Sequence, residues 1–402
     1  MASIQHPQSA TTVFLDQPPS CLEFCPEAPD HFIVGTYLLS ENKTEDGEIE
    51  QSKTGSLQLW KLDPVSKILS QIQRIAVPYA VFDLHFHPRQ KNLFAIASSV
   101  GSVSLFQVST TSTPIITQLW TKQVHEDPSI PALFLAWAPQ NWFPQPAADG
   151  FAVTFSDSRT AVFGTEGDIC QEESIAEWGT YEAKQMIEVW FVALSTSTGT
   201  PEAESQNPSA TPFMFTGNDF GSLHTRRFDN TTELDDPDEH ISPMLLEHDD
   251  RARHHTAGVT AILPLDVPLV DDAPVLLTGC YDESLRVYHA TRRGEVLVEQ
   301  GLDGGVWRMQ LLNTTRIPGE YRFLVLASCM HAGTRLVRVT CKHEDGTPNW
   351  GIEVLAKFTE HESMNYASGV WEGGQETTRS SKILCVSSSF YDRRLCVWAV
   401  DL

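Results

Sequence analysis

The sequence predicts an all-β protein assembled from seven copies of one short-strand unit. Apolar runs of about four to eight residues are separated by clusters of Gly, Pro, Asp and Ser along nearly the whole chain, which is the pattern of strands and turns. The clearest runs also share one order. An apolar strand ends in small residues, a tight turn follows, and an alternating strand closes on an aromatic or apolar residue.

Three copies near the C-terminus define the unit, and four weaker copies precede them. The clear copies are residues 275–290, 324–339 and 384–400, and the weaker ones are residues 32–62 (with an insert), 93–108, 151–163 and 213–228. A further strand precedes each copy, as in residues 81–88, and usually one follows, as in residues 295–300. Repeats of four short strands are typical of β-propellers, in which each repeat forms one blade. We therefore predict a seven-bladed WD-repeat β-propeller that forms a single domain over residues 1–402.

The last unit lacks its fourth strand, because the chain stops at Leu402. We expect residues 11–17 to fill this gap and close the ring. Polar insertions interrupt the repeat at residues 41–54, 195–211 and 229–243, and we expect them to be loops, since they are rich in Ser, Thr, Pro, Asp or Glu. Two interpretations of their charge stay open: solvation alone, or docking of a basic partner.

The composition excludes several classes of partner. The 402 residues include 28 Lys+Arg and 52 Asp+Glu, a formal net charge of −24, so we expect neither nucleic-acid nor membrane binding. No apolar run approaches the ~18 residues of a membrane helix, and the N-terminus does not resemble a secretory signal. The eight cysteines form no pattern with zinc spacing, so we expect buried free thiols, no metal or cofactor, and a cytoplasmic location. A monomer is expected, because closed propellers expose few strand edges.

Side chains of several blades should converge on one rim. When strands a to d run outward from the centre of a blade, the b–c turn and the d–a loop lie on the same side. These turns and loops supply Asp157, Asp219, Tyr281, Asp282, His331, Tyr391, Asp392, His254, His255, Asp303 and His361. Trp307, Arg308 and Tyr366 lie at the starts of inner strands, near the expected mouth of the central channel.

Part of this set has a structural interpretation. Blades of Trp-Asp repeats commonly tie a d–a histidine to a b–c aspartate and to a Ser or Thr on strand b. The pairs His255 with Asp282 (through Thr278) and His361 with Asp392 (through Ser387 or Ser388) fit this pattern. We expect both pairs to be hydrogen-bond networks within a blade.

Blade six departs from this rule. Its turn carries His331 where the others carry aspartate, and its loop offers Asp303 where the others offer histidine. Either the pair is swapped and structural, or His331 acts as a general base, which its ordinary pKa near neutrality would allow.

The rim motifs, taken together, resemble a known family. They are TGNDFGSL (216–223), HTAGV (255–259), TGCYDESLRVY (278–288), GGVWRM (304–309), ASCMHAG (327–333), EHESMNYAS (360–368) and SSFYDRRLCVW (388–398). Their order and spacing resemble the WD-repeat diphthine methylesterase family of diphthamide biosynthesis. The resemblance covers residues 213–400, and the first half matches only in general pattern. Phe220 stands where a second acidic residue is expected, and residues 177–186 lack an expected histidine.

The resemblance implies a carboxylic ester hydrolase. Its substrate would be elongation factor 2 carrying the methyl ester of diphthine, a histidine modified with a trimethylammonium-bearing chain. Hydrolysis would give diphthine and methanol without a cofactor. Under this hypothesis His331 activates a water molecule and Arg308 stabilises the developing negative charge, while Cys329 stays open as an alternative nucleophile. The expected substrate-binding residues are Asp219, Tyr281, Asp282, Trp307, His361 and Tyr366.

A second function stays open. The sequence has no GxSxG nucleophile elbow, P-loop, GxGxxG or HExxH motif. The alternative is a non-catalytic WD-repeat scaffold that binds elongation factor 2 or its modifying enzymes.

Overall fold

The structure, a computed structural model, describes residues 3–43, 49–109, 113–198, 210–229, 234, 236, 239–344, 347–373 and 382–402. Strands grouped into seven sheets make up nearly all the regular structure of these residues, beside one 3-10 turn at Glu172–Ser174. The seven sheets are the blades of a β-propeller, so the predicted fold class is confirmed. Within the same residues, no helix is long and apolar enough to cross a membrane.

The chain divides into two compact units. The first comprises residues 1–132, 325–337 and 354–402, and the second comprises residues 133–324 and 338–353. A single domain over residues 1–402 stays a prediction.

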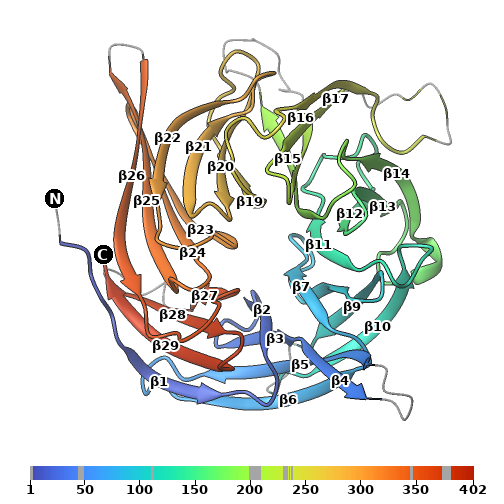
Figure 1. Ribbon diagram of the computed structural model, residues 1–402. Helices are drawn as coiled ribbons and strands as arrows, with labels where there is room; N and C mark the ends of the chain where they lie inside the picture. Colours follow the sequence, from blue (N-terminus) through green and yellow to red (C-terminus); the bar gives the residue numbers. More distant parts are fainter. Residues whose placement is uncertain are drawn as a thin grey trace. The chain divides into compact units, whose positions relative to one another are not determined.

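The first unit holds three sheets of antiparallel strands (Figure 1). The strands are β2 (Pro19–Phe24), β3 (His31–Thr36), β4 (Leu38–Lys43), β5 (Ile49–Leu62) and β6 (Leu69–Val77) in the first sheet, β7 (Val81–Phe86), β8 (Leu93–Ser98), β9 (Ser102–Val108) and β10 (Ile116–Gln123) in the second, and β27 (Ser368–Val370), β28 (Lys382–Ser389), β29 (Arg394–Asp401) and β1 (Ser9–Phe14) in the last.

The N-terminal strand completes the last sheet. β1 pairs antiparallel with β29, with Thr12 opposite Cys396, and the two strands lie side by side in Figure 1. The backbone N–H of Asp401 also donates to Gln5 Oε1 at 3.1 Å. The predicted closing strand is therefore present, although it spans residues 9–14 rather than 11–17.

Two predicted loops contain strand. Residues 41–43 belong to β4 and residues 49–54 to β5, and these segments pair with each other, so the loop predicted over 41–54 was wrong there. β15 and β16 extend into the second predicted loop, where Thr198 pairs with Ala210. In both cases polar strands pair mainly with one another and need no apolar face. Residues 44–48, 199–209 and most of 230–238 lie outside the described residues.

The second unit holds sheets three to five from residue 133 onward, and the sixth sheet crosses the division between the units. The strands are β11 (Ala132–Trp137), β12 (Asp149–Phe155), β13 (Arg159–Thr165) and β14 (Ala176–Glu182) in the third sheet, β15 (Val189–Thr198), β16 (Ala210–Asn218), β17 (Leu223–Phe228) and β18 (Met244–Asp249) in the fourth, β19 (Val259–Pro264), β20 (Val275–Cys280), β21 (Ser284–His289) and β22 (Glu295–Gly301) in the fifth, and β23 (Arg308–Ile317), β24 (Glu320–Ser328), β25 (Thr334–Glu344) and β26 (Thr347–Phe358) in the sixth.

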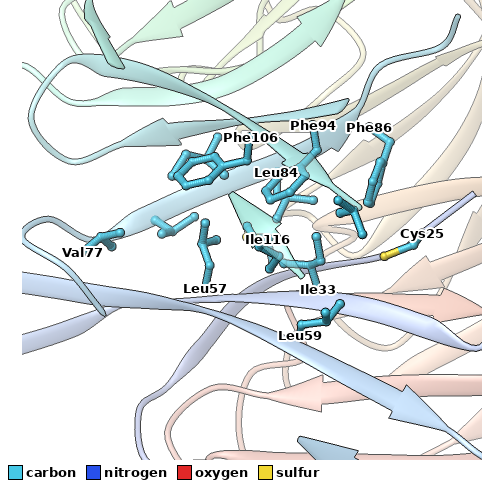
Figure 2. Close-up of a cluster of buried hydrophobic side chains, with 14 of the residues drawn as sticks. Cys25, Ile33, Leu57, Leu59, Val77, Leu84, Phe86, Phe94, Phe106 and Ile116 are labelled. Atoms are coloured by element: carbon cyan, nitrogen blue, oxygen red, sulfur yellow. The ribbon is translucent and has the colours of Figure 1, made fainter. Parts of the chain in front are cut away.

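The core consists of apolar side chains packed between the faces of neighbouring sheets. Figure 2 shows one such cluster in the first unit, where Ile33 and Leu57 of the first sheet meet Leu84 and Phe94 of the second. Phe94 and Phe106 stack with ring centroids 5.2 Å apart. Burial of these side chains is the main stabilising term of a sheet-on-sheet contact. All eight cysteines are free thiols and seven are buried, as predicted.

The predicted histidine networks are present in part. His255 Nε2 lies 2.9 Å from Thr278 Oγ1, and His361 Nε2 lies 2.8 Å from Ser387 Oγ. Trp398 Nε1 donates to the same Ser387 hydroxyl at 3.0 Å. Burial lowers the pKa of His255 to about 3 and that of His361 to about 4, so both rings stay neutral near pH 7.

The aspartate half of each network was predicted wrongly. Within the described residues, Nδ1 of neither histidine has a hydrogen-bond partner. Each aspartate instead accepts the backbone N–H one residue beyond the histidine. Asp282 Oδ2 accepts from Thr256 N at 3.0 Å, and Asp392 Oδ2 from Glu362 N at 3.3 Å. The aspartates therefore fix the loop backbone rather than the histidine ring.

Candidate functional site

Three aromatic side chains of the second unit form one cluster. Trp190 and Trp307 have ring centroids 5.6 Å apart, Tyr281 and Trp307 5.9 Å, and Trp190 and Tyr281 6.2 Å. The Trp190 ring is nearly perpendicular to that of Tyr281, with an interplanar angle of 90°. All three side chains are half-buried, so part of each remains accessible to a ligand. We call these three residues the aromatic cluster.

The starts of inner strands position the two tryptophans. Trp190 follows Val189 at the start of β15, where the register with β16 shifts between Val189 and Phe191. Trp307 follows Val306 directly before β23. An irregularity of this kind re-aims a side chain from the regular alternation of a strand.

Two glycines allow the close approach that brings the cluster together. A Cβ on Gly279 of β20 would lie 2.7 Å from Val306 Cγ1, so only glycine lets the segment before Trp307 pack this closely. A Cβ on Gly258 would lie 2.8 Å from Tyr281 Cδ2 and 3.0 Å from Asp219 Oδ1. Tyr281 and Asp219 are thus both held against the backbone at Gly258.

Asp219 adds a negative charge beside the cluster. Trp190 Nε1 donates to Asp219 Oδ1 at 2.7 Å, and the Asp219 backbone N–H donates to Glu188 O at 2.9 Å. The carboxylate therefore orients the Trp190 indole and stays fixed on the β16–β17 turn.

Arg308 packs against the Trp307 ring and binds the Trp307 carbonyl oxygen. Its guanidinium carbon lies 4.5 Å from the centroid of the Trp307 ring and 4.7 Å from that of Phe134. Nη1 donates to Thr260 O and to Trp307 O, both at 2.9 Å. These contacts give Arg308 a clear positioning role, while its role as oxyanion donor stays a prediction.

Asp282 and His361 serve the sheets rather than the cluster. Both carboxylate oxygens of Asp282 accept from Arg286, each at 2.9 Å, and Arg286 and Thr256 hold the pKa of this carboxyl well below its usual range against the opposing effect of burial. His361 is buried against Ser387.

Tyr366 lies in the first unit, in a second group of aromatic rings. Its ring centroid lies 5.3 Å from that of Phe390, which also contacts Tyr391 at 5.0 Å and Tyr37 at 6.0 Å. Burial, followed by the charge of Tyr391, raises the pKa of Tyr366. This hydroxyl is therefore a neutral donor near pH 7.

His331 is exposed on the β24–β25 turn of the first unit. The preceding residue, Met330, has a φ of 44°, and its carbonyl accepts from Asn365 N at 2.9 Å. The turn that carries His331 is thus tied to the segment that carries Tyr366. Cys329, in contrast, has no exposed surface, so a protein-borne ester cannot reach its sulfur in this structure.

The structure thus brings together four of the predicted site residues. Asp219, Tyr281, Trp307 and Arg308 meet at the aromatic cluster, whereas His331, His361 and Tyr366 belong to the other unit. In the part of the chain that the structure describes, no group of three or more His, Cys, Asp or Glu side chains could hold a metal ion.

Trp190 was not predicted as a site residue. Its signal is the Val-Trp pair at residues 189–190, which recurs at residues 306–307 at the start of another inner strand. Aligning inner strands as closely as the b–c pairs would have placed Trp190 beside Trp307.

Several aromatic rings beside a carboxylate are typical of sites that recognise a cation without hydrogen-bond donors. Ring faces attract such a cation through their quadrupoles, and quaternary ammonium groups are bound in this way. The second unit of this β-propeller thus carries a candidate site for a quaternary ammonium group.

Comparison with curated proteins finds two relatives over nearly the whole chain. The chain is 23% identical over 389 residues to the diphthine methyltransferase of Schizosaccharomyces pombe, a match that covers 96% of each protein. It is 21% identical over 403 residues to the diphthine methyltransferase homolog of Dictyostelium discoideum, covering 96% of this chain and 98% of the relative. No family model matches the sequence.

Solved structures support the fold alone. Sqt1 of Saccharomyces cerevisiae is similar with a TM-score of 0.55 at 11% identity, over 98% of this chain and 99% of Sqt1. A chain in the crystal structure of the mitotic checkpoint complex gives a TM-score of 0.52 at 11% identity, over 100% of this chain and 97% of that one.

Proposed function

We propose that this protein hydrolyses the methyl ester of diphthine on elongation factor 2, as a step of diphthamide biosynthesis. The aromatic cluster with Asp219 is the observation that carries the proposal. It suits the trimethylammonium group of this substrate, and the two full-length relatives named for diphthine supply the substrate class.

Recognition rests on the fixed charge of the substrate. A trimethylammonium group is cationic at every pH and has no N–H to donate, so ring faces and a nearby carboxylate bind it better than hydrogen-bond acceptors alone. Each cation–π contact contributes about 0.5–2 kcal/mol, the upper value applying to desolvated pairs. Arg308 is itself over one face of Trp307, so the substrate cation would use the remaining faces of the cluster.

The reaction needs a base and a stabiliser of negative charge. A general base would take a proton from water as the oxygen attacks the ester carbonyl carbon, and the assignment of this role to His331 stays a prediction. The tetrahedral oxyanion would be stabilised by Arg308. Its collapse breaks the bond to the methoxy oxygen, which leaves as methanol with the proton held by the base, and the carboxylic acid left on the substrate releases its own proton to solvent to become the carboxylate.

The relatives' printed name describes methyl transfer rather than ester hydrolysis. Both reactions concern the same modified histidine. Transfer adds a methyl group from a donor, whereas hydrolysis uses water to remove the methyl group of the ester. Transfer adds about 14 Da per methyl group to the substrate, whereas hydrolysis of the ester removes about 14 Da. One measurement of mass therefore separates them.

The test uses purified full-length protein and elongation factor 2 that carries methylated diphthine. Mass spectrometry of the modified peptide should show a loss of about 14 Da without added cofactor. A gain of the same mass with a methyl donor would replace hydrolysis by methyl transfer. Tight binding with no change of mass would support the scaffold alternative and end the proposal of an enzyme.

A further inference from the structure

A basic cavity lies in the second unit, apart from the aromatic cluster. Its volume is about 740 Å³. It is lined by Lys184, Glu247, His248, Asp249, Arg251, Arg253, Thr291, Arg292 and Arg293. Five of these nine side chains are cationic, in a chain whose net charge is −24. A concentration of positive charge against this background is a feature that the proposed function does not use.

Two turns form the walls. Residues 250–253 begin the connection from β18 to β19, which runs to residue 258, and residues 290–294 connect β21 to β22. The walls are joined, because His254 Nε2 lies 3.1 Å from Arg293 O. Gly294 N donates to Thr291 O at 3.0 Å and closes the second turn.

The first wall has an unusual backbone. Arg251 and Ala252 both have left-handed conformations, with φ of 57° and 52°. Two carboxylates stabilise them: Asp249 Oδ1 accepts from Arg251 N at 2.7 Å, and Asp250 Oδ1 accepts from Ala252 N at 3.1 Å. Left-handed residues other than glycine cost free energy, so the surrounding contacts must hold this turn in place.

The arginines of the cavity are not neutralised. Among the described residues, none of Arg251, Arg253, Arg292 and Arg293 has a carboxylate oxygen within ion-pairing distance, whereas exposed Arg316 pairs with Asp266. All four arginines are exposed. Their guanidinium groups are therefore available to a ligand.

Both carboxylates of the cavity are already engaged. Glu247 Oε1 accepts from Arg226 Nε at 2.9 Å. The Asp249 side chain is only 2% exposed, with Lys184 Nζ at 3.8 Å from its Oδ2. Their negative charge is thus largely offset within the protein, and the cavity presents a positive surface.

We propose that this cavity binds a small molecule through a polyphosphate group. Guanidinium forks bind phosphate oxygens in pairs, and several of them converge best on a ligand that concentrates three or four negative charges in a few atoms. The volume falls within the usual range of about 300–1,000 Å³ for small-molecule sites, which favours such a ligand over a flat docking surface. An acidic peptide is the competing ligand.

The test measures binding of inorganic tripolyphosphate to the full chain by isothermal titration calorimetry at fixed ionic strength. The double variant Arg251→Glu with Arg292→Glu should weaken binding about tenfold or more, because it removes two charge-assisted contacts. Arg316→Glu, an exposed arginine outside the cavity, should change affinity less than about twofold, since it reverses one charge and removes the ion pair with Asp266 but changes no residue that lines the cavity.

The double variant Arg251→Gln with Arg292→Gln repeats the test without charge reversal, and thermal unfolding checks that each variant folds. An absence of saturable binding, an equal loss with Arg316→Glu, or tighter binding of a glutamate-rich peptide than of tripolyphosphate would each overturn the proposal. None of these results depends on ester hydrolysis, so the polyphosphate site and the proposed function are tested independently.

Discussion

Asp219 is the residue at which charge and ring geometry can be separated. Its carboxylate accepts the Trp190 indole N–H, and an asparagine carbonyl could accept the same bond without the charge. Asp219→Asn should therefore raise the KM for the diphthine methyl ester roughly three- to tenfold while kcat stays near that of the wild type. Steady-state kinetics on modified elongation factor 2 measures both values. Asp266→Asn is the control, and an unchanged KM would remove Asp219 from recognition.

His331 is a clean target because its side chain is exposed and supports no described contact of the fold. His331→Asn should lower kcat about 10²–10⁴-fold, the usual contribution of a general base, and leave the melting temperature unchanged. His343→Asn on β25, another exposed histidine, should have no effect on kcat. Full activity of the His331 variant would show that another group activates the water.

The sequence predicted most of the aromatic cluster but not its geometry. Tyr281, Trp307 and Asp219 follow turn and strand patterns that repeat along the chain, so their place could be inferred. Trp190 could not be linked to them as easily, because its contact with Asp219 joins an inner strand to a turn of the same sheet. The positioning contacts of Arg308 with two carbonyls also depend on backbone atoms, which sequence patterns do not locate.

Among the strands, β1 is the one whose removal tests most directly how the last sheet is completed. Deleting residues 1–14 would expose the edge of β29 along its paired length. We expect a loss of several kcal/mol in the free energy of unfolding and concentration-dependent self-association, since an unpaired edge strand recruits other strands. Thermal unfolding and size-exclusion chromatography measure the two effects. Deletion of residues 1–4 is the control, and equal behaviour of both truncations would contradict the role of β1.

The buried histidine of the last sheet should make stability depend on pH. His361 has a pKa of about 4 in the folded chain against 6.5 when unfolded, because burial disfavours its charged form. Its stabilising contribution is full above pH 6.5 and declines as the pH falls toward 4, since only the unfolded chain takes up the proton in that window.

The variant His361→Gln can keep a hydrogen bond to Ser387 and does not titrate. Urea unfolding at pH 7 and at about pH 5 should show a loss for the wild type that exceeds the loss for the variant by about 2 kcal/mol. His343→Gln provides the control for an exposed histidine. A variant with the same pH dependence as the wild type would exclude His361 as the source.

Elements were predicted best where strands are apolar. The all-buried β8 and β20 follow directly from their apolar runs. The β4–β5 hairpin was missed because its strands are polar and pair with each other, so hydrophobic periodicity carries no signal there. The Asp-Gly dipeptide at residues 46–47 favours a hairpin and was the available clue, although it lies outside the described residues.

Over the whole molecule, the distribution of charge favours two different ligands: a cation at the aromatic cluster and an anion at the basic cavity. The net charge of −24 suits a cationic substrate side chain, while five cationic side chains gather at one cavity. Cation recognition at the aromatic cluster should therefore weaken with added salt less than polyphosphate binding does, because ring faces contribute part of the former.

The most direct measurement compares the affinity of the protein for elongation factor 2 in two states, with methylated diphthine and with the unmodified histidine. We expect at least about tenfold tighter binding of the modified form, and loss of that difference in Trp190→Ala and Trp307→Ala variants that still fold. Equal affinity for both forms, or a preference that survives both substitutions, would contradict recognition of the trimethylammonium group by the aromatic cluster.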